Sequence, residues 1–567
     1  MTATTSEAVP VPTMMAALAV YLERRALVML ALGFSAGLPF LLIFDTLSAW
    51  LRDAGLSLNV IGVFSLATLV YSFKFLWAPL IDRTTVPMLT AWLGHRRSWM
   101  LLCQIVITLG LWLVAGSDPR ASLGAMALCA IGVGFASATQ DVVIDAWRIE
   151  AADVAKQGVM AAAYQWGYRL AMIVAGALPL LLAQAYSWNL SYAVMAGLMG
   201  VGMAAVVFAP REASHTIRVI HTEHVQASRA IEIVEWVARL LVLALGALLL
   251  GSGLAANVSV AAQLLSGVGL APLGEGLLAA WRSDAGVWYQ FASVVVGFGV
   301  IVVSTLAIPG VRTRPGLYLG SALGDPLKDF FKRYRGSAAL ILALICTYRL
   351  SDFVLNIMNP FYLDLGFSLT EVAEVRKVFG VVASMLGVFA GGVAIARLGL
   401  MRALLVGAFG GPVSNLVFIW LGMRGHDLPA LFAAISVDNV ASGFAGTCLI
   451  AYMSSLTAQG FTATQYALFS SLYALPGRLI ASQSGRLVES AAHSADSGGV
   501  FSPLNGLFTG LPPESFAQAL QKSGVGPASL GSGYTVFFLY STLVGIFAVV
   551  LTFVLVLGRK VPTAGPA

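Results

Sequence analysis

Residues 134–150 read GFASATQDVVIDAWRIE. The segment begins as an apolar run and then places Gln140, Asp141 and Asp145 where a membrane-spanning helix is normally apolar. An ionised carboxylate in hydrocarbon costs roughly 3 kcal/mol or more, so such a residue usually has a function. Asp141 and Asp145 are four residues apart and therefore share one face of a helix. We expect the rest of the chain to be arranged around that face.

The composition is that of a membrane protein with many spans. The chain has 567 residues, of which 58% are hydrophobic and 11% charged, and its mean hydropathy is +0.85. A soluble domain is about one quarter charged. These values predict an all-α polytopic protein whose main partner is the lipid bilayer. The net charge of +6 does not indicate nucleic acid, because the cytoplasmic loops of membrane proteins collect Lys and Arg.

Fourteen segments approach the roughly 20 apolar residues that one span needs. They are residues 27–50, 58–79, 99–117, 121–146, 159–184, 188–209, 235–256, 286–308, 338–361, 374–396, 401–423, 428–456, 463–489 and 534–557. With a cytoplasmic N-terminus, twenty Lys and Arg fall on the cytoplasmic side and eight on the other. This asymmetry predicts that both termini are cytoplasmic.

Short strings recur in the two parts of the chain in the same order. DAGLSL at 53–58 resembles DLGFSL at 364–369, and GFAS at 134–137 resembles GFAG at 443–446. Five such matches keep an offset of 302 to 311 residues. The repeat predicts two six-helix halves separated by a two-helix insert. The resulting parts are a disordered tail at 1–23, one half at 24–210, a linker with two extra helices at 211–336, the other half at 337–557 and a tail at 558–567.

Two six-helix halves in one orientation are the layout of the major facilitator transporters, in which the substrate binds between the halves near the midplane. The basic and acidic residues of the loop after the second span resemble the signature of that class, and we expect ion pairs between helix ends to close the cytoplasmic side. Anchoring of the loops by the positive-inside rule is the alternative. The candidate gating residues are Asp82, Arg83, Arg96, Arg97, Asp145, Arg148, Arg397 and Arg402.

Asp141 is the candidate for proton coupling. A carboxylate withdrawn from water can take up and release a proton near neutral pH. A structural hydrogen bond to another helix is the alternative. Asp145 lies nearer the helix end beside Arg148, where an ion pair is the simpler explanation.

Other polar and aromatic side chains within the spans predict a wide wet site for a bulky substrate. Arg169 and its repeat partner Arg478 require anions, which either protein carboxylates or the substrate would supply. The candidate substrate-binding residues are Gln140, Arg169, Tyr164, Tyr168, Asp45, Tyr348, Arg349, Asn356, Gln465, Tyr466 and Arg478.

No metal or cofactor is expected. His215, His221 and His224 share one loop, but no cysteine completes a metal-binding spacing. The cysteines lie inside apolar runs, which favours buried free thiols. They are Cys103, Cys129, Cys346 and Cys448.

Several strings resemble the AmpG muropeptide permease family. They are GFSAGLP at 33–39, WLRDAG at 50–55, KFLWAP at 74–79, ATQDVVIDA at 138–146 and TQYAL at 464–468. The resemblance covers roughly residues 24–209 and 325–490. It implies proton-driven import of N-acetylglucosaminyl-anhydro-N-acetylmuramyl peptides across a bacterial inner membrane for peptidoglycan recycling, with Gln140 and Asp141 as site residues.

Two alternatives compete with that reading. A related carrier could take another bulky anion, such as a nucleotide-linked acyl donor. A membrane-embedded transferase would place its acids in a surface loop, whereas these acids lie within spans, so we expect no enzyme. We expect a monomer whose small-molecule partners are a glycopeptide and protons.

Overall fold

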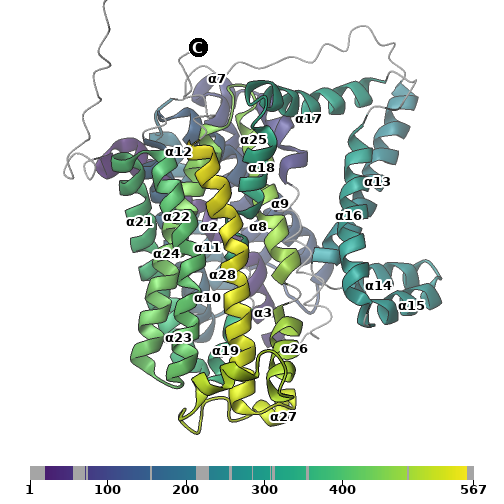
Figure 1. Cartoon of the computed structure of the whole chain (residues 1–567). Helices are drawn as coiled ribbons and strands as arrows, with labels where there is room; N and C mark the ends of the chain where they lie inside the picture. Colours follow the sequence, from purple (N-terminus) through teal and green to yellow (C-terminus); the bar gives the residue numbers. More distant parts are fainter. Residues whose placement is uncertain are drawn as a thin grey trace, which may run out of the picture.

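The computed structural model describes residues 20–557 except for 55–70, 72–73, 154–155, 212–228, 255–257, 284, 307, 309–312, 353–356 and 482–483. Every regular element in these ranges is a helix (Figure 1). Most of the predicted disordered tail at 1–23 and the whole of the predicted tail at 558–567 lie outside the described residues. Residues 20–22 form a short helix, and the Tyr21 ring packs on Phe389 with ring centroids 4.9 Å apart.

The first half contains the long helices that carry most of the candidate site. Its elements are η1 (Val20–Leu22), α2 (Arg24–Leu41), η2 (Leu42–Thr46), α3 (Leu47–Asp53), η4 (Lys74–Leu76), α6 (Ala78–Arg83), α7 (Leu89–Leu93), α8 (His95–Ala115), α9 (Leu123–Glu150), α10 (Gln157–Ala185), α11 (Trp188–Leu198) and α12 (Gly200–Phe208).

The linker adds a helix pair beside the bundle and one helix across its end. Its elements are α13 (Arg229–Leu254), α14 (Ser259–Gly267), α15 (Ala271–Arg282), α16 (Gly286–Thr305) and α17 (Arg314–Arg333). In Figure 1, α17 lies across the end of the bundle that also holds α7, which we call the α17 end.

The second half completes the bundle. Its elements are α18 (Ala338–Thr347), α19 (Met358–Asp364), α20 (Leu369–Val372), η7 (Ala373–Phe379), α21 (Gly380–Leu398), α22 (Leu400–Ser414), α23 (Leu416–Arg424), α24 (Leu428–Ser455), α25 (Thr462–Ala481), α26 (Ser484–Asp496), η8 (Ser502–Phe508), α27 (Ala519–Ser523) and α28 (Pro527–Leu557). The surface where α9 and α10 meet α21, α24 and α25 is called the seam.

Eleven helices of the described part are long and apolar enough to cross a membrane. Three of the fourteen expected spans are missing from that set, each for a different reason. Most of 58–79 lies outside the described residues. Segment 338–361 contains two short helices, α18 and α19, and segment 463–489 contains the more polar α25. The all-α polytopic class is confirmed, and the count of fourteen stays a prediction.

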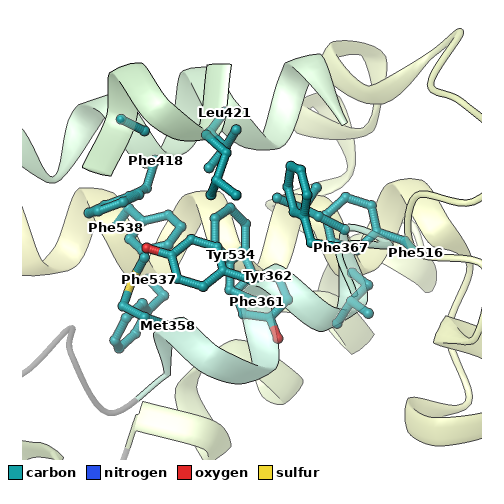
Figure 2. Packing of buried hydrophobic residues seen from close by; sticks show 14 of the residues in the cluster. Met358, Phe361, Tyr362, Phe367, Phe418, Leu421, Phe516, Tyr534, Phe537 and Phe538 are labelled. Atoms are coloured by element: carbon teal, nitrogen blue, oxygen red, sulfur yellow. The ribbon is translucent and has the colours of Figure 1, made fainter. Parts of the chain in front are cut away.

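The Ser-, Gly- and Pro-rich segment after α26 folds onto the second half. Phe516 is 1% exposed and belongs to an aromatic cluster with Phe361, Tyr534 and Phe538 (Figure 2). The Phe516 backbone N–H donates to the Asp364 carbonyl oxygen over 2.6 Å, and the Tyr534 hydroxyl donates to the Asp364 carboxylate over 2.7 Å. This segment therefore packs on the end of the bundle opposite α17 instead of forming a free loop.

Helices α2 and α10 touch backbone to backbone because glycines face the contact. A Cβ atom on Gly167 would lie 1.9 Å from the Leu30 carbonyl oxygen, and one on Gly33 would lie 2.2 Å from the Tyr164 carbonyl oxygen. Small residues that permit such close approach are typical of helix pairs in membranes. This contact holds α10, and the polar residues it carries, at a set depth against α2.

We expect Gly167→Ala to destabilise the protein by about 3 kcal/mol or more, because the obstructing atom is backbone and overpacking alone costs about 1–3 kcal/mol. The unfolding midpoint in detergent would measure the loss. Gly197→Ala in α11 is the matched control, because its Cβ would meet nothing within 4 Å. Equal midpoints for the two variants would contradict the close contact.

Candidate functional site

Asp141 lies on the side of α9 that faces α10. Its side chain is 8% exposed, and the Tyr164 hydroxyl donates to its Oδ1 over 3.4 Å. The ammonium group of Lys74 attracts both the Asp141 and Asp145 carboxylates. The Tyr168 and Tyr71 phenols also lie within electrostatic range of the Asp141 carboxylate. The predicted acid thus sits among three tyrosines and one lysine, an arrangement able to hold or pass a proton.

Gln140, its neighbour in sequence, has a different environment. The side chain is fully buried, and its Nε2 donates to the Ser35 hydroxyl of α2 over 3.2 Å. Gln104 of α8 donates to the same hydroxyl over 3.4 Å. These contacts all lie within the first half, and a role of Gln140 in substrate binding stays a prediction.

Asp145 and Arg148 form an ion pair of 3.2 Å one turn apart on α9. Arg148 also reaches the second half, because its Nη1 donates to the Ser454 hydroxyl over 2.9 Å and its guanidinium lies over the Tyr466 ring at 5.2 Å. The pair is therefore part of the contact between the halves, and Tyr466 packs on it.

Two residues of α10 bind the second half directly. Gln165 donates to the Thr447 hydroxyl over 2.8 Å, and the Trp166 indole donates to the Met385 carbonyl oxygen over 2.8 Å. Neither residue was selected from the sequence. In the sequence alone, either side chain could be an ordinary packing residue of a helix. Only its hydrogen-bond partner, more than 200 positions away in the chain, shows that it joins the two halves.

Arg169 of the first half and Arg349 of the second half face each other closely enough for their charges to repel. Arg349 forms an ion pair with Asp352 and donates to the Ser442 hydroxyl over 2.8 Å. Within the described part of the chain, Arg169 makes no hydrogen bond or ion pair. One cation at the seam is therefore neutralised by protein and the other is not.

The remaining candidates for substrate contact divide into two groups. Tyr348 is 3% exposed, and its hydroxyl donates to the Leu404 carbonyl oxygen over 2.8 Å inside the second half, so its role in substrate binding stays a prediction. The Asp45 and Arg478 side chains and the whole of Asn356 lie outside the described residues.

At the α17 end, Asp82 joins the two halves. It accepts from Arg96 over 2.8 Å, and Arg96 also pairs with Glu150 over 2.7 Å. Asp82 further accepts from the Thr464 backbone N–H over 2.9 Å and from the Thr464 hydroxyl over 2.7 Å. A carboxylate of the first half thus occupies the N-terminal end of α25, where exposed N–H groups favour negative charge.

The other basic gating candidates have separate environments. Arg97 donates to the Ala209 carbonyl oxygen over 2.9 Å within the first half. Arg83 donates to the Ser321 carbonyl oxygen of α17 over 3.1 Å. Arg397 and Arg402 are exposed.

Gln465 binds α17. Its Nε2 donates to the Pro326 carbonyl oxygen over 2.8 Å, and its Oε1 accepts from Arg333 over 3.1 Å. Because Arg83 of the first half also binds α17, this helix connects both halves at the same end. The sequence alone showed a basic linker here and did not indicate the contact.

No cluster of three or more His, Cys, Asp or Glu side chains that could hold a metal occurs among the described residues. The donors that gather at the seam are tyrosine, arginine and amide groups. They suit hydrogen bonding to a polar organic molecule more than they suit metal coordination.

The described helices have the major facilitator architecture, which is a fold of membrane transporters. The proton:xylose symporter XylE, bound to 6-bromo-6-deoxy-D-glucose, matches 94% of this chain and 94% of its own chain with a TM-score of 0.50 and 11% identity. That similarity concerns the fold alone.

The sequence comparisons are more specific. The anhydromuropeptide permease of Escherichia coli (strain K12) is 29% identical over 475 residues, which is 83% of this chain and 76% of that protein. The putative transporter AmpG 4 of Rickettsia felis is 28% identical over 473 residues, 83% of this chain and 91% of that protein. The pattern of the family described as Acetyl-coenzyme A transporter 1 matches residues 25–184. The chain is thus a homologue of the AmpG-type permeases, and the predicted resemblance is confirmed.

Proposed function

We propose that this protein imports cell-wall muropeptides from the periplasm to the cytoplasm, driven by protons. The observation that carries the proposal is the homology to anhydromuropeptide permeases over 83% of the chain. The seam adds physical support, since it brings together an acid, tyrosines and arginines from both halves. A glycopeptide offers hydroxyl, amide and carboxylate groups that such side chains bind.

In this proposal Asp141 carries the coupling proton. It is withdrawn from water, its hydrogen-bond donor Tyr164 comes from α10, and α10 is the helix that contacts the second half through Gln165 and Trp166. A change in the charge of Asp141 would therefore act on the helix that moves against the other half. Asp145 and Arg148 would act as part of the gate.

Uptake by the purified protein in sealed vesicles tests the proposal. We expect an inward proton gradient to drive accumulation of anhydro-muropeptide, and we expect a protonophore to abolish it. Vesicles that take up no muropeptide under an imposed gradient would refute the proposed function.

A carrier for a nucleotide-linked acyl donor is the second candidate. The match of residues 25–184 to the acetyl-coenzyme A transporter family favours it. Uptake of each labelled compound separates the two candidates: the first predicts accumulation of muropeptide that excess acetyl-coenzyme A leaves unchanged, and the second predicts accumulation of acetyl-coenzyme A that excess muropeptide leaves unchanged.

We also propose that the conformation described is closed at the α17 end and that this end is cytoplasmic. The contacts of Asp82 with Thr464 and of Arg148 with Ser454 support closure. A reporter fused after Leu557 should be active only in the cytoplasm. Activity only in the periplasm would reverse the orientation and with it the direction of transport.

We expect Gln465→Ala to loosen α17, since the substitution removes its hydrogen bonds to Pro326 and Arg333. Trypsin should then cleave α17 several-fold faster. Ser321→Ala is the matched control, because only the Ser321 backbone carbonyl binds Arg83. Unchanged cleavage in Gln465→Ala would show that these bonds do not hold the helix.

A further inference from the structure

The two arginines at the seam are unequal. Asp352 neutralises Arg349 from one turn along the chain, and Ser442 of α24 accepts a second hydrogen bond of 2.8 Å from it. Arg169 faces Arg349 from α10 and has no such partner in the described part of the chain. A nearby anion stabilises a partly buried cation that lies close to another cation, because opposite charge offsets both the repulsion and the lost hydration.

Packing brings Arg349 of the second half close to Gln165 of the first half. A Cβ atom on Gly446 would lie 3.0 Å from Arg349 Nη1 and 3.6 Å from Gln165 Oε1. Gly446 therefore leaves space that both side chains use. Arg169 is one helical turn beyond Gln165 on α10, which places it on the same side of that helix.

Asp352 is well placed to leave Arg349. Its side chain is 27% exposed, so it is not locked in the protein interior. Asp438 of α24 lies close to Asp352 and accepts from the Ser414 hydroxyl over 3.2 Å. The negative charge of Asp438 repels Asp352 and so weakens its hold on the site.

We propose that Arg169 and Arg349 together bind one anionic group of the substrate, a carboxylate or a phosphate, and that Asp352 is the internal anion which this group displaces from Arg349. The guanidinium fork suits both oxyanions. Because the two arginines belong to different halves, the bound anion draws the halves together. The inference rests on the proposed function as a carrier and specifies which part of the cargo is recognised.

Binding to the full-length protein in detergent tests the inference without transport. The carboxylate probes are an anhydro-muropeptide with free peptide carboxylates and the same compound with those groups amidated. The phosphate probe is acetyl-coenzyme A. For the wild type we expect one probe class to bind, and removal of its negative charge to weaken binding at least tenfold.

The variants assign that charge preference to residues. Arg169→Gln should remove the preference for the charged probe, and Arg169→Lys should restore part of it. Asp352→Asn should raise the affinity for the charged probe several-fold, because Arg349 is then free. Asp438→Asn is the control of opposite sign: it removes the charge that repels Asp352, so Asp352 should hold Arg349 more firmly and the affinity for the charged probe should fall.

The outcomes separate the two proposals. If only acetyl-coenzyme A binds and its affinity depends on Arg169, the anion site stands and the muropeptide function fails. If muropeptide binds and Arg169→Gln keeps the full preference for free carboxylates, the anion site is overturned while the function stands. Weaker binding of the charged probe by Asp352→Asn overturns the role of Asp352. Absence of Arg169-dependent binding of every probe overturns the whole inference.

Discussion

Asp141→Asn is expected to abolish proton-driven accumulation of substrate, with a loss of at least a hundredfold in the uptake rate. Asparagine keeps the size and most hydrogen bonds of the side chain, so Tyr164 retains a partner. It cannot bind and release a proton, and the protein would lose the step that couples the gradient to transport. Folding and insertion should be unaffected.

Exchange of labelled for unlabelled substrate across vesicles without a gradient provides the sharper measurement. A carrier that has lost only coupling still exchanges substrate, whereas a misfolded one does not. Asp118→Asn, in the loop before α9, is a control for general loss of an acid, and we expect wild-type uptake from it. Wild-type accumulation by Asp141→Asn would remove this residue from the mechanism.

Asp82→Ala should destabilise the conformation described by about 3–5 kcal/mol, which is the usual cost of breaking a buried ion pair from one side. Arg96 is 0% exposed and would lose one of its two carboxylates. The N-terminal N–H groups of α25 would lose their acceptor at the same time. Both effects act at the contact between the halves, so the α17 end should also open more readily.

The unfolding midpoint in detergent measures the first effect. Labelling of a cysteine placed at Ala463 measures the second, because this buried residue meets Asp82 through its backbone N–H and not through its side chain. Asp325→Ala is the matched control, because that carboxylate is 44% exposed and lies 3.8 Å from Arg83. Because Asp325 is partly in water and the two atoms are 3.8 Å apart, we expect this pair to contribute less than about 1 kcal/mol. If both variants lowered the midpoint equally, the special role of Asp82 would be lost.

The stretch at 134–150 shows how far residue type and spacing lead. Charged groups inside an apolar run make α9 the candidate for the proton-coupling helix, because burying a charge without a function is costly. Spacing also brought Asp145 and Arg148 together, since residues three apart meet on a helix. Spacing alone could not show that Gln140 and Asp141 have different environments. The two point about 100° apart on the helix, and only the neighbouring helices determine that one meets Ser35 and the other Tyr164.

The contacts between halves were beyond any local pattern. Asp82 meets Thr464 because the two halves close on each other, and Arg83 meets Ser321 because α17 of the linker lies across the same end. Nothing near either residue in the chain indicates its partner. The segment after α26 is a similar case. Its Ser, Gly and Pro content indicates a loop, yet Phe516 is buried because an aromatic pocket on α19 and α28 accepts it.

The sequence by itself therefore determined the all-α membrane class, the homology to AmpG-type permeases and the helix on which the buried acids lie. Hydropathy and the free-energy cost of burying a charge are properties of individual residues, so the sequence records both without the fold. Only the tertiary structure decided which face of α9 meets the seam, that Arg169 faces Arg349, and that α17 binds both halves. Those facts depend on the rotation and depth of each helix, which close contacts such as Gly167 against Leu30 set in three dimensions.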